Sequence, residues 1–567
     1  MNRRTIQSVI FAALLVLGAL ACIGMAALRH HQPEPGLPQD VSGTGLYLRL
    51  YDQPEAPVVQ LWQEPDTGHL YAFLPGWADA DKILISSFDP AASFALDGQT
   101  MRGRGFVSLA SGSHTLRLPG REQDVPLTVL RGSTGLPTLF LNLDAGSAEV
   151  LHSDKSIVET GWCQGVDSDG TLLFRDDMRI HGRGNTSWAG PGKSGYLLRT
   201  ERRQDVFGMG EARKWVLVPN ALDPTLLRNK IMYTLAEDAG MPGVVESRWT
   251  EVYLNGEYRG VYLLCEKIEI GPSRLDLHDL ERQTEQLNPK LDLTTMERRP
   301  RGDWDVPGSG SYYDIPVDAP DVTGGYLMEA DSVQRYPERP SGFVSERGQH
   351  IVLHSPVYLS AAQLNYVSAV YQYVENAAFS PDGIDPATGR SLAELADLDS
   401  FAAKYLAEEI SKNLDGTNSS AYYYKPADST STLLYAGPLW DYDYALASPS
   451  DMVGAEAAAE LRDPVGFRIK EDWELLYQMT RHPIFQEAVR RNFYEKWMPA
   501  VRKMLDSGID GMTELLLPSM DMDLLRWNVW PEAQTPEQRR AAYLGEVDTV
   551  RSFLEQRTAW LAAQWPQ

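Results

Sequence analysis

The chain has 567 residues, and its 77 acidic and 52 basic side chains give a formal net charge of −25. Hydrophobic residues make up 43% and charged residues 23%, which is ordinary globular usage and excludes wholesale disorder. The negative charge disfavours nucleic acid and anionic lipid as main partners, because both are polyanions. A polyanionic ligand would therefore have to bind through a local basic region.

The three cysteines, Cys22, Cys163 and Cys265, are too few for a disulfide framework and form no CxxC metal pair. We expect Cys163 and Cys265 to be buried as small hydrophobes. A disulfide between them, formed outside the cytosol, is the alternative.

Residues 1–31 have the pattern of a membrane signal. Two arginines precede an uncharged apolar stretch from Val9 to Leu28, which as a helix would span about 30 Å and cross a bilayer. The positive-inside rule then places the rest of the chain outside the cytoplasm. We expect an uncleaved transmembrane anchor, and a signal sequence cleaved near Ala26 is the alternative.

Residues 32–45 are rich in Pro, Gly and polar side chains and are expected to form a linker. From 46 to about 145 short alternating runs such as LYLRLY, KILISSF and PTLFLNL are separated by turns. This pattern predicts a small antiparallel, sandwich-like β module, more typical of a spacer or packing domain than of a site.

Residues 146–270 mix strands with one helix and contain a basic, glycine-rich segment, IHGRGNTSWAGPGKSGYLLR, at 180–199. Its glycines let backbone amides approach a ligand, and Arg183 and Lys193 add positive charge. Ten basic and four acidic residues between Arg179 and Lys230 give a local charge of +6, which would attract polyphosphate. The spacing matches no common phosphate-loop motif, so a solvated glycine-rich turn is the competing interpretation.

A helix is predicted over Leu222–Gly240, with Asp223 as N-cap, Pro224 at its first position and Gly240 as its stop. The dipeptide Asn255-Gly256 between two apolar runs then predicts a tight β-hairpin.

Residues 271–465 begin with a polar segment near 271–320 that looks like an insertion or long surface loop. A strand at GGYLMEAD, helices near 358–378 and 398–413, and a tyrosine-rich strand pair are expected to follow. Residues 466–567 are expected to be helical.

Two acidic groups in this region are candidate sites. Asp415 and Asn418 lie in a loop directly after the second helix, where a simple turn is the competing interpretation. Asp441 and Asp443 are two apart, so an extended strand would put both on one side, about 6–7 Å apart at Cα. Such a pair could bind a divalent cation that shares ligands with phosphate, or act as the acid/base pair of a glycosidase. Two solvent-facing acids on an edge strand are the competing interpretation.

The order of these parts is that of protein-kinase-like phosphotransferases: a basic glycine-rich strand pair, a helix, a hairpin, an Asp…Asn loop and a second Asp. The usual kinase signatures HRD and DFG are not in the sequence.

Five motifs, from RGNTSW (183–188) through WVLVPNALDPTLLRN, VYLNGEYRGVYLLCEKI and GGYLMEAD to GPLWDYD (437–443), resemble the CotH family of spore-coat-protein-H-like atypical kinases. The resemblance implies an α+β, two-lobed, protein-kinase-like fold. Its N-lobe would be 146–270, its C-lobe core 271–465 and its C-terminal helical part 466–567.

The resemblance also implies transfer of the γ-phosphate of ATP to Ser or Thr of a protein, with Mg²⁺ or Mn²⁺. Asp415 would orient the acceptor hydroxyl and accept its proton. The implied metal-binding side chains are Asp441, Asn418 and Asp443, and the implied nucleotide-binding ones are Arg183, Asn185, Lys193, Arg228 and Glu266.

We therefore expect a bacterial, membrane-anchored, extracytoplasmic kinase of envelope or spore-coat proteins. A catalytically inactive kinase-like scaffold or binding protein of the envelope or spore coat is the alternative. A surface glycosidase using Asp441 and Asp443 is a third interpretation, and the basic glycine-rich segment counts against it.

Overall fold

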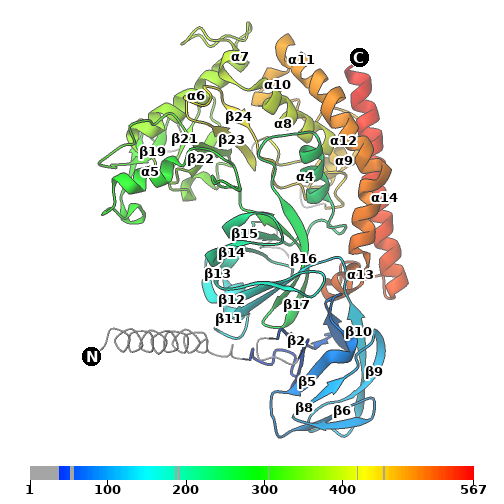
Figure 1. Cartoon of the computed structure of the whole chain (residues 1–567). Coiled ribbons are helices and arrows are strands. Elements are labelled where there is room, and N and C mark those ends of the chain that lie inside the picture. The colour runs from blue at the N-terminus through cyan, green and yellow to red at the C-terminus, as the bar shows by residue number, and fades with distance from the viewer. Residues whose placement is uncertain are drawn as a thin grey trace, which may run out of the picture.

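The computed structural model describes residues 37–51, 56–185, 188, 192–303, 306–417, 419–450 and 454–566. The expected membrane segment at 1–31 lies outside them. Within the described ranges, no helix combines the length and apolar character needed to cross a bilayer. The fold is of the mixed α+β class: two small sheets lie at one end, a barrel in the middle, and a larger sheet beside a group of helices at the other end (Figure 1).

The N-terminal β module consists of two sheets that share one apolar core. The first has the order β2-β1-β5-β8 and the second β3-β4-β10-β9-β6-β7. The strands are β1 Leu46–Arg49, β2 Val58–Gln60, β3 Trp62–Gln63, β4 Leu70–Leu74, β5 Ile83–Ser87, β6 Ser93–Leu96, β7 Gln99–Arg102, β8 Arg104–Val107, β9 Gly112–Arg117 and β10 Asp124–Arg131. The expectation of a wholly antiparallel module is wrong at one pair, because β10 runs parallel to β4.

A closed barrel follows, with the strand order β11-β12-β13-β14-β15-β17-β16. Its strands are β11 Thr138–Leu143, β12 Val158–Val166, β13 Leu172–Arg183, β14 Gly195–Asp205, β15 Glu211–Val218, β16 Ser247–Leu254 and β17 Glu257–Glu266, and helix α2 Glu149–Ser153 links the first two. Strand β11, which the sequence pattern assigns to the β module, instead closes the barrel through parallel pairing with β16. Cys163 and Cys265 lie on barrel strands, and both are buried free thiols, as expected.

Two local predictions in this region have different outcomes. Asn255 and Gly256 form the tight turn between β16 and β17 with φ of 51° and 81°, the left-handed conformation that a two-residue hairpin needs. Helix α4 spans Arg228–Asp238, so Asp223 is not its N-cap. Leu226 has a φ of 57°, which breaks the helical path. The Asp223 carboxylate accepts from the backbone N–H of Thr225 in the preceding turn and, at 2.8 Å, from that of Arg228, the first residue of α4.

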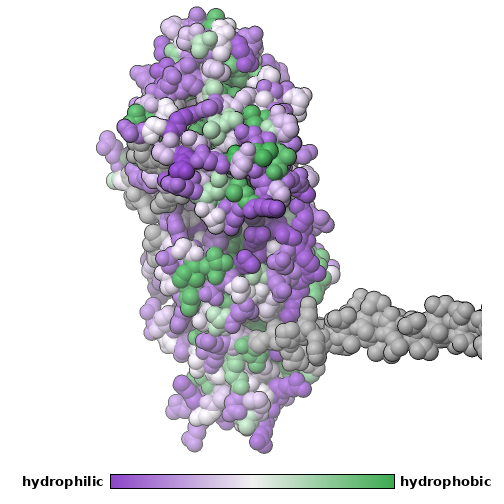
Figure 2. All heavy atoms as spheres, turned by 90° about the vertical axis from the view of Figure 1, so that its left-hand side faces the viewer, coloured by the Kyte–Doolittle hydropathy of each residue, from purple (hydrophilic) through white to green (hydrophobic). Residues whose placement is uncertain are grey.

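The second large sheet has the order β18-β19-β21-β22-β20-β23-β24. Its strands are β18 Arg298–Arg301, β19 Gly310–Tyr313, β20 Tyr326–Ala330, β21 Gly342–Val344, β22 His350–Ser355, β23 Ala421–Lys425 and β24 Tyr435–Ala436. The expectation of a long surface loop at 271–320 is therefore incomplete, because helix α5 Leu280–Leu287 and the hairpin β18–β19 fold within it. The face shown in Figure 2 is mainly hydrophilic, with its hydrophobic side chains in small separate groups.

The helices pack beside this sheet and along the barrel (Figure 1). They are α6 Ala361–Phe379, α7 Leu392–Leu395, α8 Leu398–Ser411, α9 Ala455–Arg462, α10 Leu475–Met479, α11 Pro483–Asn492, α12 Met498–Lys503, α13 Ile509–Trp527 and α14 Pro536–Gln564. Helix α8 is almost wholly buried, including both Glu408 and Glu409. Helix α13 packs on β17 and β10 and so joins the C-terminal helices to the barrel and the β module.

Candidate active site

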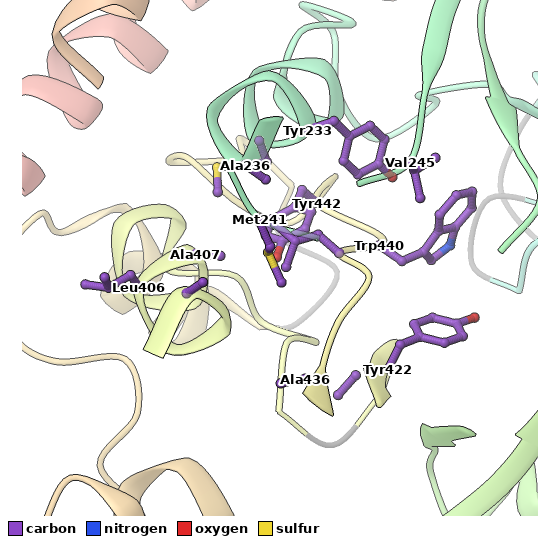
Figure 3. Close-up of a cluster of buried hydrophobic side chains, with 14 of the residues drawn as sticks. Tyr233, Ala236, Met241, Val245, Leu406, Ala407, Tyr422, Ala436, Trp440 and Tyr442 are labelled. Atoms are coloured by element: carbon purple, nitrogen blue, oxygen red, sulfur yellow. The ribbon is translucent and has the colours of Figure 1, made fainter. Parts of the chain in front are cut away.

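The segment Gly437–Asp443 is held by its aromatic residues. Trp440 and Tyr442 are buried on either side of Asp441, and their rings lie 6.2 and 6.5 Å from that of Tyr233 on α4 (Figure 3). Asp441 is only partly buried and has a φ of 69°, so the segment is a loop and not the extended strand predicted from its spacing. The loop conformation turns one carboxylate outward while its neighbours stay in the core.

Asp441 and Asp443 nevertheless lie close together. Burial raises the pKa of Asp443 well above its usual range, and the negative charge of Asp441 beside it raises it further. Asn229 on α4 binds this segment twice: its Nδ2 donates to Asp443 Oδ1 at 3.2 Å, and its Oδ1 accepts from the backbone N–H of Tyr442 at 2.8 Å. Two crowded carboxyl groups of this kind form a site for a positive charge.

The loop that carries Asp415 is tied to the Asp441 segment by Asn413. The Nδ2 of Asn413 donates to the carbonyl of Asp441 at 3.1 Å, and its Oδ1 accepts from the backbone N–H of Asp415 at 3.3 Å. Arg468 supports the loop from below by donating to the carbonyls of Asn413 and Leu414 at 2.8 and 2.6 Å. The two acidic segments predicted separately from the sequence therefore meet in one place.

Asp415 has the electrostatics of a base. Burial raises its pKa to about 6, and the charge of Asp441 adds to this, while Arg335 and Arg468 lower it. A carboxyl group with a pKa near neutrality can both accept and release a proton at physiological pH. Gly416 follows it, and a β-carbon there would come within 1.7 Å of Glu408 Oε2, so a larger residue would have to displace the Glu408 carboxylate.

Of the expected nucleotide-binding residues, Arg183 lies next to the acidic segments. It ends β13, and its guanidinium lies 4.7 Å from the centre of the Trp440 ring, directly before Asp441. Asn185 is exposed near the same strand end and accepts a hydrogen bond from Lys155 Nζ at 3.0 Å.

Lys193 is engaged elsewhere. Its side chain is 5% exposed, and its ammonium lies 2.7 Å from Asp523 on α13 and donates to the carbonyl of Val261 on β17. Burial lowers its pKa, and Asp523 partly offsets this. Lys193 therefore bonds to the far end of the chain and not to any acid of the 415–443 group.

Arg228 is fully buried and holds the backbone that follows Asp443. Its guanidinium pairs with Asp223 and Glu546 and donates to the carbonyls of Ala445, Leu446 and Ala447. Leu446 and Ala447 both have positive φ, of 49° and 55°, and these bonds keep that loop in place. Arg228 thus positions the metal-binding candidate segment from inside.

Glu266 ends β17 and is largely buried. It binds Arg274 and accepts from the backbone N–H of Glu246 at 3.1 Å. Burial raises its pKa to about 7, and Arg274 lowers it in part.

The basic stretch 179–230 is not one uniform positive surface. Five of its ten cations make ion pairs: Lys193 with Asp523, Arg202 with Asp176, Arg203 with Glu211, Lys214 with Glu269, and Arg228 with Asp223. Glu211 and Asp223 belong to the stretch and are already counted in its +6, but Asp523, Asp176 and Glu269 lie outside it and neutralise part of that charge.

Several residues at the site carry no local sequence signal for it. Arg335 and Arg468 reach the Asp415 loop from distant elements. Asn413 and Ser420 are sequence neighbours of Asp415, but their hydrogen bonds to Asp441 form only through folding. Glu329 lies in the recognised motif GGYLMEAD, yet no role follows from the motif alone. Asn418, the remaining metal-binding candidate, lies outside the described residues.

The fit of a divalent cation rests on the Asp441–Asp443 pair. In the part of the chain that the structure describes, no group of three or more His, Cys, Asp or Glu side chains is arranged to hold a metal. Two carboxylates are nonetheless what a Mg²⁺ site offers when phosphate oxygens and water complete its coordination. The unfavourable crowding of Asp441 and Asp443 is relieved by such a cation, so the side chains fit it.

A comparison with protein families matches residues 179–561 to the CotH kinase protein family. The matched region begins in β13 and ends in α14, and it includes Asp415, Asp441 and Asp443. The chain belongs to the CotH kinase family. No curated protein matches it.

Proposed function

We propose that the chain is an ATP-dependent protein kinase that phosphorylates Ser or Thr of envelope or spore-coat proteins. The observation that carries this proposal is the meeting of Asp415, whose pKa is raised to about 6, with the crowded pair Asp441 and Asp443. Family membership supports the same reaction class, because the family is one of kinases.

On this proposal the barrel acts as the N-lobe and the sheet with its helices as the C-lobe of a kinase-like fold. Arg183 on β13 reaches Trp440 between them and would contribute positive charge to the nucleotide phosphates. Lys193 takes no part in this proposal, since its ammonium is bound by Asp523.

Asp415 would orient the acceptor hydroxyl and take its proton. Asn413 fixes the distance between Asp415 and Asp441 by bonding to both backbones, and Arg468 prevents the loop from moving away. Positioning of this kind is the main contribution that a protein makes to phosphoryl transfer.

Asp441 and Asp443 would hold Mg²⁺ or Mn²⁺, and that cation would supply neutralisation of phosphate charge. Burial and mutual repulsion raise the free energy of the ionised pair without a cation. Asn229 and Arg228 keep both carboxylates and the following loop in place.

The remaining parts of the proposal concern location. We place the domain outside the cytoplasm behind an N-terminal anchor or cleaved signal, on the apolar stretch at 9–28. Proteins of the envelope or spore coat are then the accessible substrates.

The alternative is an inactive kinase-like scaffold, which is favoured by the ion pair of Lys193 with Asp523 because it keeps this lysine from nucleotide. Nucleotide binding distinguishes the two. The protein of residues 37–567 is heated with Mn²⁺ and a non-hydrolysable ATP analogue, separately and together. We expect stabilisation only with both, by about 2.7 kcal/mol at a hundredfold excess over the dissociation constant. Equal stability with and without nucleotide and metal would support the scaffold.

A further inference from the structure

The motif GGYLMEAD contains β20, an inner strand of the second large sheet, between β22 and β23. Its Glu329 is buried, with an exposed fraction of 4%. Its Oε2 lies 2.6 Å from Nε2 of His354 on β22, and its Oε1 accepts from the backbone N–H of Ser420 at 3.1 Å. A buried carboxylate is therefore fully engaged on both oxygens.

Ser420 connects this carboxylate to the candidate site. It lies directly before β23, has a φ of 54°, and its Oγ donates to Asp441 Oδ2 at 3.3 Å. A left-handed backbone conformation is strained for serine, and it persists only where the surrounding structure holds it. The bond from its N–H to Glu329 supplies that hold, and the hydroxyl is then aimed at Asp441.

We propose that Glu329 is a positioning residue of the active site, which orients the metal-binding carboxylate Asp441 through Ser420, with His354 fixing Glu329 from the other side. This inference rests on the proposed function in assigning metal to Asp441. The chain of contacts runs from β22 through β20 to the loops before β23 and after β24. All four strands belong to one sheet.

The ionisation of Glu329 agrees with this arrangement. Burial raises its pKa, but the hydrogen bond from His354 and the charges of Arg339 and Arg335 outweigh burial and hold the pKa below its usual value. Glu329 is thus an anion, which makes a stronger acceptor for the Ser420 N–H than a neutral group does.

The test uses Glu329→Gln and Ser420→Ala in the full chain. Glutamine keeps the shape of the side chain but removes its charge, and alanine removes only the hydroxyl that reaches Asp441. We expect both variants to need about tenfold more Mn²⁺ for half-maximal binding and phosphotransfer, as changes to groups that orient metal ligands do. The double variant should be no worse than the worse single variant, because both act on one contact chain.

The matched control is Glu375→Gln. Glu375 on α6 is also a buried carboxylate, 3% exposed, and it accepts from Ser345 Oγ at 2.6 Å. Its loss should lower thermal stability without changing the Mn²⁺ requirement.

Hydrogen exchange of the metal-free protein gives a readout that does not depend on the proposed function. Glu329→Gln and Ser420→Ala should speed exchange at the backbone amides of 419–421 and 440–443, while Glu375→Gln leaves them unchanged. Unchanged exchange there, or a Mn²⁺ requirement equal to that of the wild type, would overturn the inference. If the wild type binds no Mn²⁺ but the two variants still loosen 440–443, the positioning of Asp441 stands and the proposed function fails.

Discussion

At the scale of single residues, the proposed function depends on a few carboxyl groups whose pKa values differ because their surroundings differ. Asp443 is buried beside Asp441 and its pKa is raised well above the usual range. Asp415 lies nearer to Arg335 and Arg468, and its pKa is raised only to about 6. The surroundings of Asp443 suit a carboxyl group that binds a cation, and those of Asp415 suit a group that exchanges a proton.

The pH dependence of phosphotransfer should report Asp415. Because burial raises its pKa to about 6, Asp415 is protonated below that pH and cannot accept the hydroxyl proton. We expect kcat/KM to rise about tenfold per pH unit below pH 6 and to level off above it. Asp415→Asn should lose at least about a hundredfold in kcat at every pH. A flat profile across pH 6 would contradict the role given to Asp415.

The interior loop after Asp443 gives a second test at this scale. Arg228→Met removes the donors that hold the carbonyls of Ala445 and Leu446 and leaves Asp223 buried without its partner. Breaking a buried pair in this way should lower the free energy of unfolding by about 3–5 kcal/mol. Denaturant unfolding measures it, and Arg203→Met, which removes an exposed ion pair at 4.0 Å, is the control that should change stability little. Equal stability of the two variants would refute the role of Arg228 in holding the loop after Asp443.

At the scale of elements, long-range pairs join helices to sheets. Lys193, just before β14, pairs with Asp523 on α13, and Arg557 on α14 pairs with Glu409 on α8, with all four side chains almost fully buried. Neither pair can be anticipated from sequence, since its members are 330 and 148 residues apart, respectively. Each fixes a C-terminal helix against an element that carries or supports the site.

Lys193 distinguishes a structural from a nucleotide-binding role. Lys193→Met leaves Asp523 buried and unpaired, and we expect a loss of about 3–5 kcal/mol in the free energy of unfolding. The double variant Lys193→Met/Asp523→Leu should recover most of it, because no charge stays buried. Nucleotide affinity of the folded protein should be unchanged in both. An affinity for nucleotide that falls in both variants would restore Lys193 to the phosphate site.

How much the sequence predicts depends on how local the cause is. The turn at Asn255-Gly256 and helix α8 follow from neighbouring residues, and both are found. The start of α4 is missed because Leu226 adopts a positive φ that no local pattern announces. Asp415 and Asp441 are found as acidic motifs, but they meet through the hydrogen bond of Asn413 to Asp441, which is a tertiary contact. The role proposed for Glu329 likewise depends on its tertiary contact with Ser420.

At the scale of the whole molecule, the β module and the barrel share a core. Phe140 and Tyr253 of the barrel and Met522 of α13 pack into the apolar cluster of the two N-terminal sheets. The module is therefore part of the folded unit, which agrees with the expected packing domain and not with an independent spacer.

Removing the module should expose that interface. A chain that begins at residue 132 would leave Tyr253, Tyr258 and Leu525 open to water, and we expect it to aggregate or to unfold at a clearly lower temperature. Size-exclusion chromatography and thermal unfolding of the shortened and full chains measure this. A soluble monomer with the thermal stability of the full chain would show the module to be dispensable.

Transfer of labelled γ-phosphate from ATP tests the central claim most directly. The protein of residues 37–567 is incubated with labelled ATP, Mn²⁺ and a protein extract of envelope or spore coat, beside Asp415→Asn, Asp441→Asn and the control Glu375→Gln. The account predicts metal-dependent labelling of protein by the wild type and the control, and at least about a hundredfold less by the two Asp variants while they remain folded. Labelling by Asp415→Asn and Asp441→Asn at the wild-type rate, or none by the wild type, would contradict it.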